Sequence, residues 1–521
     1  MMFALMAEAA QKNAPWEETE AALFIASNVI QNLLPEEDSI VPELISQLVQ
    51  LAPQTAHPAL ILTAIQFMGG CSEWLGKHPP IQDPVMQWLL IYVVNPIYAS
   101  HASESIEKIC SQASIVRFIP PLSAAIERLE ATTTNGKCVE KACQDITKAL
   151  AMLCNSLSRQ ELGEQLKKIC EPILMRLTMS IDASTAQVAH DENKGDAWMQ
   201  MAHKPLIWID RIASVFREIK PLEKVNYDLN QAQPWLPVAQ HTLQISSQIL
   251  TKYEADGRII EHTCRAIRHV IRSLGMQSAS FVPALATQLM TIYQHYQHSC
   301  ILYLASIIVD EYGALPELQD GLIQMLQMLA ISTFPILQKA HGFRNNPDTV
   351  DDLFRLAHRY ITRCPSVFFV HPICDKLLDC ALHGLHVDHG EANRSVTKYT
   401  TEMINQLISA RRHNYMDDGV KAAQQLVNSY ADRLTEHALK AALFDVSSYL
   451  RRELTDVICS LGKYDRELQA RALIHAISTL PRGPLCATEE QLKQFHDQVC
   501  KDGTDTRNVV GYVRELVKLY E

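Results

Sequence analysis

The chain has 521 residues, of which 47% are hydrophobic, and it carries a formal net charge of −11. This apolar content supports a large folded core, whereas the acidic balance argues against general binding to nucleic acid or to membrane surfaces. The 14 cysteines are scattered among apolar residues, which indicates reduced, buried thiols rather than a disulfide framework. No apolar run reaches the length that spans a membrane.

The first half of the chain repeats apolar residues at spacings of three and four, the pattern of amphipathic helices. Pro35 and Pro53 follow the ends of two such segments, because proline cannot continue a helix. The predicted helices cover residues 13–34, 40–51, 57–75, 83–94, 103–119, 122–131, 139–157, 159–181, 199–219 and 238–253. Residues 182–196 lack this periodicity and predict a mobile loop, and residues 220–234 predict a second irregular connection.

The same pattern continues through the second half, and no segment resembles a convincing strand. The predicted helices cover residues 257–274, 280–296, 299–312, 317–339, 347–363, 373–385, 391–410, 418–433, 437–462, 466–480, 488–500 and 506–520. Helices that recur in pairs about every 40 residues are typical of HEAT repeats. We therefore predict an all-α fold, an α-α superhelix of the HEAT-repeat solenoid type, with residues 1–521 in one continuous stack.

The helix predicted over residues 257–274 has two contrasting faces. One face is apolar, and the other carries arginines at spacings of 7, 3 and 4, which place them within an arc of about 80°. These arginines are Arg258, Arg265, Arg268 and Arg272. Like charges along one helix edge repel one another unless an anion lies against them, and guanidinium groups bind phosphate or carboxylate in bidentate fashion. The stripe indicates either an anion-binding surface or the solvated face of an ordinary surface helix.

Candidates for catalysis or metal binding are weak. His371, Cys374, Cys380 and His383 have short spacings, but the two cysteines would point about 120° apart on one helix, so we expect no metal site. No phosphate-binding glycine loop, zinc-protease motif or nucleophile elbow is present in the sequence. We therefore expect no enzymatic activity and no cofactor.

Residues 293–313, YQHYQHSCILYLASIIVDEYG, and residues 341–359, HGFRNNPDTVDDLFRLAHR, carry a family resemblance. Together with residues 16–24, WEETEAALF, and the arginine helix, they resemble the transportin-SR group of importin-β-type karyopherins. Members of that group are nuclear import receptors for serine/arginine-rich (RS) splicing factors. The resemblance extends over the C-terminal part of such a receptor, and the N-terminal arch that holds most of RanGTP is expected to be missing.

The resemblance implies that the arginine stripe binds the phosphorylated RS region of a cargo protein. It also implies a departure, because the family has an arginine where this chain has His262, whose charge depends on pH. The cargo's own arginines would need acids, with helix capping and solvation as the alternative role of such acids. The candidates are Asp351 and Asp352, together with Asp348, Asp310 and Glu311. The implied partners are phosphorylated RS proteins, RanGTP and nucleoporins, with shuttling between cytoplasm and nucleus, and without direct contact to nucleic acid or membrane.

Two other functions stay open from the sequence. A HEAT-repeat protein can be a scaffold that organises a multiprotein complex, and an importin 13-like receptor would carry other cargo. A phosphoserine bears about −1.5 to −2 charges, so phosphorylation inverts the sign of a tail that guanidinium groups would otherwise repel. Phosphate-dependent binding would therefore distinguish a receptor for RS proteins from a scaffold, and the arginine stripe argues against the importin 13-like receptor.

Overall fold

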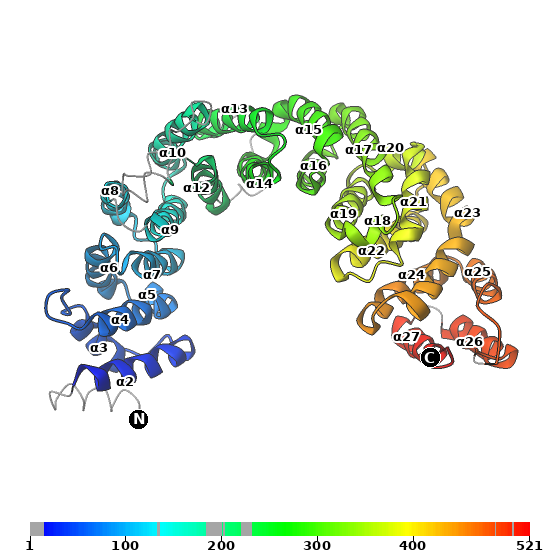
Figure 1. Cartoon of the computed structure of the whole chain (residues 1–521), viewed down its shortest axis with the longest axis horizontal. Coiled ribbons are helices and arrows are strands. Elements are labelled where there is room, and N and C mark those ends of the chain that lie inside the picture. Colours follow the sequence, from blue (N-terminus) through cyan, green and yellow to red (C-terminus); the bar gives the residue numbers. More distant parts are fainter. Residues whose placement is uncertain are drawn as a thin grey trace. The chain divides into compact units, whose positions relative to one another are not determined.

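The computed structural model describes residues 15–132, 136–183, 201, 204–219, 232–484, 486–502 and 505–520. In these ranges every regular element is a helix, which confirms the predicted all-α fold (Figure 1). Contacts divide the chain into two compact units. Unit 1 comprises Met1–Ile249 with Arg265–Gln277, and unit 2 comprises Leu250–Cys264 with Ser278–Glu521. The single stack over residues 1–521 stays a prediction.

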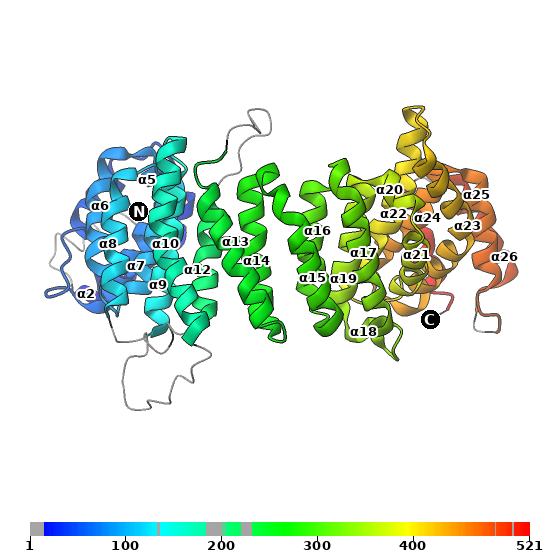
Figure 2. The ribbon, with the colours of Figure 1, turned by 90° about the horizontal axis from the view of Figure 1, so that it is seen from above.

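Unit 1 is built from antiparallel helices that alternate between two layers. Its helices are α2 (Trp16–Val29), α3 (Ile40–Leu48), α4 (Pro58–Gly70), α5 (Ser72–Lys77), α6 (Pro79–Val93), α7 (Ala99–Gln112), α8 (Ile119–Glu130), α9 (Gly136–Cys154), α10 (Arg159–Ala183), α12 (Pro205–Glu218) and α13 (Leu236–Lys252), the last of which ends in unit 2. Contacts run from α2 through α4, α7 and α9 to α12, while α6, α8 and α10 pack on that layer. Figures 1 and 2 both show α9, α10 and α12 beside one another.

Unit 2 repeats this arrangement. Its helices are α15 (Val282–Tyr296), α16 (Ser299–Tyr312), α17 (Pro316–Leu337), α18 (Gly342–Asn345), α19 (Pro347–Arg363), α20 (Pro365–Val370), α21 (Ile373–Gly384), α22 (Gly390–Arg412), α23 (Asp418–Lys440), α24 (Arg451–Tyr464), α25 (Arg466–Ser478), α26 (Glu489–Asp502) and α27 (Thr506–Val517). One layer runs α16, α19, α22, α24, α27, and the other runs α15, α17, α20, α23, α25. Two layers of paired helices around a continuous apolar core are the HEAT-repeat architecture that the periodicity predicts.

Local chemistry explains where the helices begin. Helices α17 and α19 both begin with a proline in the first turn. Proline suits this position because the N–H groups of the first turn have no partner within the helix. Asp417 caps α23 by accepting a hydrogen bond from the Val420 N–H at 2.7 Å. The helices predicted over 299–312 and 347–363 have the predicted bounds.

Two predicted helices are interrupted. The helix predicted over 57–75 is divided at Cys71 into α4 and α5. The helix predicted over 437–462 is wrong in its middle, because α23 ends in a wider π turn over Ala441–Asp445 and the chain is extended at Val446. Ser447 there donates its N–H and Oγ–H to the Asp388 carboxylate at 2.9 and 2.8 Å. This hydrogen bonding to a residue 59 positions away stabilises the interruption between α23 and α24. The local apolar spacing does not reveal it.

Two further expectations concern connections and membranes. From residue 184 onward the loop predicted over 182–196 lies outside the described residues, as does most of the connection predicted over 220–234.

Within the described part of the chain, α17 is long and apolar enough to cross a membrane by length and composition, although the sequence predicted no segment of that length. It packs against α15, α16 and α19 in unit 2, as a core helix does.

Candidate anion-binding site

The arginine helix forms with the predicted bounds as α14 (Gly257–Leu274). Asp256 accepts hydrogen bonds from the N–H groups of Arg258 and Ile259, each at 3.1 Å, so the helix start is capped by a side chain. The apolar face is buried, with Ile260 and Val270 fully covered. This burial orients the opposite face of α14, which carries the arginines, away from the core.

The predicted arginines divide between the two units. Arg258 is exposed and lies in the first half of α14, which belongs to unit 2. Arg265 is exposed, Arg268 and Arg272 are half-buried, and all of them lie in unit 1. His262 is half-buried in the unit 2 half of the helix. The described geometry of the site therefore concerns Arg265, Arg268 and Arg272.

The pKa of His269 depends on the arginines around it. The pKa of the His269 imidazole is lowered to about 4, first by burial and then by the guanidinium groups of Arg268, Arg217, Arg272 and Arg265, in that order. Arg268 Nη2 lies 3.1 Å from His269 Nε2, so a neutral imidazole accepts a hydrogen bond from that guanidinium. Burial and the neighbouring guanidinium groups therefore both oppose protonation of His269.

Arg217 is not among the site residues predicted from the sequence. It lies in the last turn of α12, where a basic residue is usually explained by the helix dipole, and 48 positions separate it from Arg265. Its side chain is 64% exposed, and its Nε lies 3.5 Å from Oε1 of Glu218, whose side chain is only 20% exposed, so the ion pair is long. We call Arg217, Arg265, Arg268 and Arg272 the arginine cluster.

The arginine cluster has the chemistry of an anion site. Guanidinium groups from α12 and α14 act on the same point of unit 1, and the neutral His269 adds a polar group without adding charge. Planar guanidinium donors match the oxygens of phosphate and carboxylate. A dianionic phosphate would gain more than a monoanionic carboxylate from such a field.

The predicted acids lie in unit 2 and already bind an arginine of this chain. Asp351 is buried, and its carboxylate accepts hydrogen bonds from Arg355 Nη2 at 2.7 Å and from Ser395 Oγ. Burial and the negative neighbours Asp351, Asp348 and Glu391 raise the pKa of Asp352 to about 7, while Arg355 opposes that shift. The contact of Asp351 and Asp352 with a cargo arginine stays a prediction.

The cysteines and histidines considered for zinc do not assemble. Cys374 and Cys380 are buried thiols, and burial raises the pKa of each to about 12. Across the described residues no group of His, Cys, Asp or Glu side chains is arranged to hold a metal ion.

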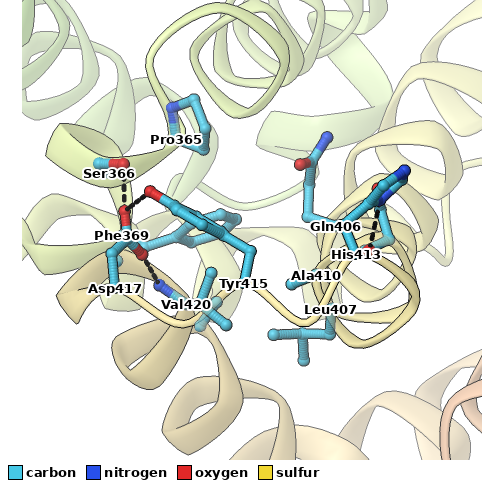
Figure 3. A pocket seen from close by; sticks show the side chains of 13 residues that line it. Pro365, Ser366, Phe369, Gln406, Leu407, Ala410, His413, Tyr415, Asp417 and Val420 are labelled. Atoms are coloured by element: carbon cyan, nitrogen blue, oxygen red, sulfur yellow. Dashed lines mark hydrogen bonds between the residues drawn. The ribbon is translucent and has the colours of Figure 1, made fainter.

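A separate pocket of about 180 Å³ lies in unit 2 where α20 meets the α22–α23 turn (Figure 3). Its walls include Phe369 and Leu407, and its carboxylate, Asp417, accepts hydrogen bonds from Ser366 Oγ at 2.6 Å and Tyr415 OH at 2.7 Å. Asp417 also caps α23, so these polar groups serve the helix start.

Comparison with known proteins relates the chain to importin-β-type karyopherins. Residues 38–118 match the model of the Transportin-3/Importin-13 third TPR domain, and residues 233–337, which contain α14, match that of the fourth. The chain is 23% identical to Transportin MOS14 of Arabidopsis thaliana over 96% of its own length and 50% of that protein. It is 20% identical to human Importin-13 over 97% of its length and 51% of that protein. The chain thus spans about half the length of the curated relatives it matches.

Solved structures give the same fold. The cytosolic state of importin 13 superposes with a TM-score of 0.76 at 16% identity and covers 100% of this chain and 57% of the other. An importin-β crystal structure superposes with a TM-score of 0.57 at 13% identity, covering 100% of this chain and 57% of the other. These likenesses establish the HEAT-repeat fold, and the narrower assignment to the transportin-SR group stays a prediction.

Proposed function

We propose that this chain is a nuclear import receptor, or the cargo-binding part of one, and that its arginine cluster binds phosphorylated RS tails of splicing factors. The observation that carries the proposal is the contact of Arg268 Nη2 with His269 Nε2 at 3.1 Å, at an imidazole whose pKa is also lowered by arginines of α12 and α14. The similarity to Transportin MOS14 and Importin-13 supports the receptor class. The phosphate preference rests on the chemistry of guanidinium groups.

The mechanism is recognition by charge inversion. An unphosphorylated RS repeat carries only arginine charges, so the cluster repels it. Each phosphoserine adds about −1.5 to −2 charges and acceptor oxygens that guanidinium groups can share. A charged hydrogen bond contributes roughly 1.5 to 3 kcal/mol, and less where water and salt reach it. Several such contacts in a row give selectivity for the modified tail.

The similarity to Transportin MOS14 and Importin-13 also leads us to propose RanGTP and nucleoporins as partners. The protein would then shuttle between cytoplasm and nucleus. The proposed function involves neither catalysis nor a cofactor, and it requires no direct binding to nucleic acid or to a membrane. An importin 13-like receptor with other cargo is the second candidate, because Importin-13 matches 97% of this chain. A HEAT-repeat scaffold is the third, and unlike the first reading it requires no phosphate.

Fluorescence anisotropy with a labelled RS peptide tests the proposal. At moderate salt we expect the fully phosphorylated peptide to bind the whole chain at least about 30-fold more tightly than the unphosphorylated peptide, since several charged contacts change sign. The affinity should fall as salt rises, because the contacts are solvated. Equal affinity for the two peptides would refute the phospho-RS function and favour the alternatives.

A further inference from the structure

A second basic pocket, of about 410 Å³, lies in unit 2 between the α23–α24 connection and the end of α27. Its lining combines the side chains of Arg451, Arg514 and Lys518 with the hydroxyl-bearing residues Ser448 and Tyr449. In a chain with a net charge of −11, basic groups gathered from α24 and α27 make a local field of the opposite sign.

The walls of this pocket are fixed by contacts on both sides. Arg451 Nε donates to the carbonyl of Ala442 at 3.2 Å, which anchors its guanidinium at the π turn. The ring of Phe444 in that turn packs edge-on against Tyr520, with the ring centroids 5.4 Å apart. The same connection is held by Asp388 through Ser447. The α23–α24 connection and the end of α27 therefore keep a fixed separation around the pocket.

Among the described residues no carboxylate lines the pocket, and the acids of the connection have other partners, since Asp388 binds Ser447 and Asp445 binds His386. Glu515 pairs with Lys518 at 2.7 Å, but both side chains are largely exposed, so this pair is weak. Glu453, in the first turn of α24, pairs with Arg394 of α22 at 3.0 Å. Arg514 and Arg451 add positive charge at the pocket without a carboxylate within its lining. Tyr449 is 56% exposed and offers a flat apolar surface beside these cations.

We propose that this pocket binds a phosphate group on an extended, phosphorylated peptide. Guanidinium, ammonium and hydroxyl donors converge on one open cavity, and such donors suit the several oxygens of a phosphoserine better than one carboxylate. The exposed ring of Tyr449 can cover the peptide backbone or an adjacent side chain. The net acidity of the chain disfavours a nucleic acid, which would bring many phosphates near its other surfaces. The identification of the peptide as an RS tail rests on the function proposed above, whereas the affinity of the pocket for phosphate does not.

The test compares two variants with the same loss of charge. Arg514→Gln with Lys518→Gln removes charge from the pocket, and Arg507→Gln with Lys501→Gln removes it from exposed positions of α27 and α26 outside the lining. We measure binding of a phosphoserine peptide and of its unphosphorylated form by anisotropy, with the whole chain at low salt. We expect the pocket variant to weaken phosphopeptide binding about fivefold relative to the control variant, as for the loss of solvated ion pairs.

The same measurement in an Arg265→Ala, Arg268→Ala, Arg272→Ala background separates the two proposals. A fivefold pocket effect that persists in this background supports the pocket, even if that background by itself leaves phosphopeptide binding unchanged and so refutes the arginine cluster. Pocket and control variants that bind the phosphopeptide equally would overturn the proposal. A single-stranded oligonucleotide that binds the pocket more tightly than the phosphopeptide does would also overturn it.

Discussion

Replacing Arg265, Arg268 and Arg272 together with alanine is expected to weaken binding of a phosphorylated RS peptide by at least about 100-fold. Each lost charged contact removes roughly 1 kcal/mol or more at a solvated site, and the neighbouring contacts act on one phosphorylated tail. Arg268 and Arg272 are half-buried, so their contacts are screened less than that of Arg265. Anisotropy of the labelled phosphopeptide at fixed ionic strength measures the loss.

A matched control keeps this result specific. Arg128, Lys137 and Lys167 are exposed basic residues of unit 1 that lie outside the arginine cluster. Their triple replacement by alanine removes the same charge from the chain and should change the affinity by no more than about threefold. Circular dichroism confirms that both variants are folded. If the two triple variants bind the phosphopeptide alike, the arginine cluster is not the site.

A second large effect is expected at Glu130, whose side chain is 10% exposed and pairs with two arginines of unit 1. Glu130 pairs with Arg211 at 2.5 Å and also with Arg176, and the Arg211 side chain is 4% exposed. The two guanidiniums lie 4.9 and 5.2 Å from the ring centre of Trp208. Replacing Glu130 with alanine leaves the charge of Arg211 buried without its partner. We expect the stability of unit 1 to fall by about 3 kcal/mol, since breaking one side of a buried pair costs that much.

Urea denaturation followed by circular dichroism checks this expectation. Glu127→Ala is the matched control, because Glu127 is an exposed acid of the same helix and changes there should cost less than about 0.5 kcal/mol. Replacing Glu130 and Arg211 together with leucine should recover much of the loss, because no uncompensated charge then stays buried. Equal urea midpoints for Glu130→Ala and Glu127→Ala would show that the pair contributes little.

Much of the fold could be predicted from local patterns. The bounds of α14, α16 and α19 follow from apolar spacing, and α14 also begins after the capping Asp256 and α19 with a proline. The break after α23 could not be predicted, because Asp388 holds Ser447 from another helix pair. The division at Cys71 did have a local signal, because Gly69 and Gly70 end α4 directly before it.

The site shows the same boundary between local and tertiary information. The arginine stripe of α14 is visible as a helical spacing in the sequence. Arg217 joins it only because α12 packs in the same unit, and a lone basic residue in a last turn carries no specific signal. The pair formed by Asp351 and Arg355 had a usable signal, because residues four apart on a helix face one another. That spacing already indicates that Asp351 has an arginine partner within its own helix.

The most direct test measures the pKa of His269 with and without the phosphopeptide. The pKa comes from a pH titration of the histidine resonances by NMR, in which the resonance missing from the His269→Gln variant identifies His269. In the free chain, burial and the arginine cluster hold this pKa at about 4. A phosphate bound among Arg217, Arg265, Arg268 and Arg272 would offset the positive field and favour the protonated imidazole, so the pKa should rise by about one pH unit or more toward its ordinary value. The unphosphorylated peptide should leave it unchanged. A His269 pKa that stays at about 4 with saturating phosphopeptide would contradict binding at the arginine cluster.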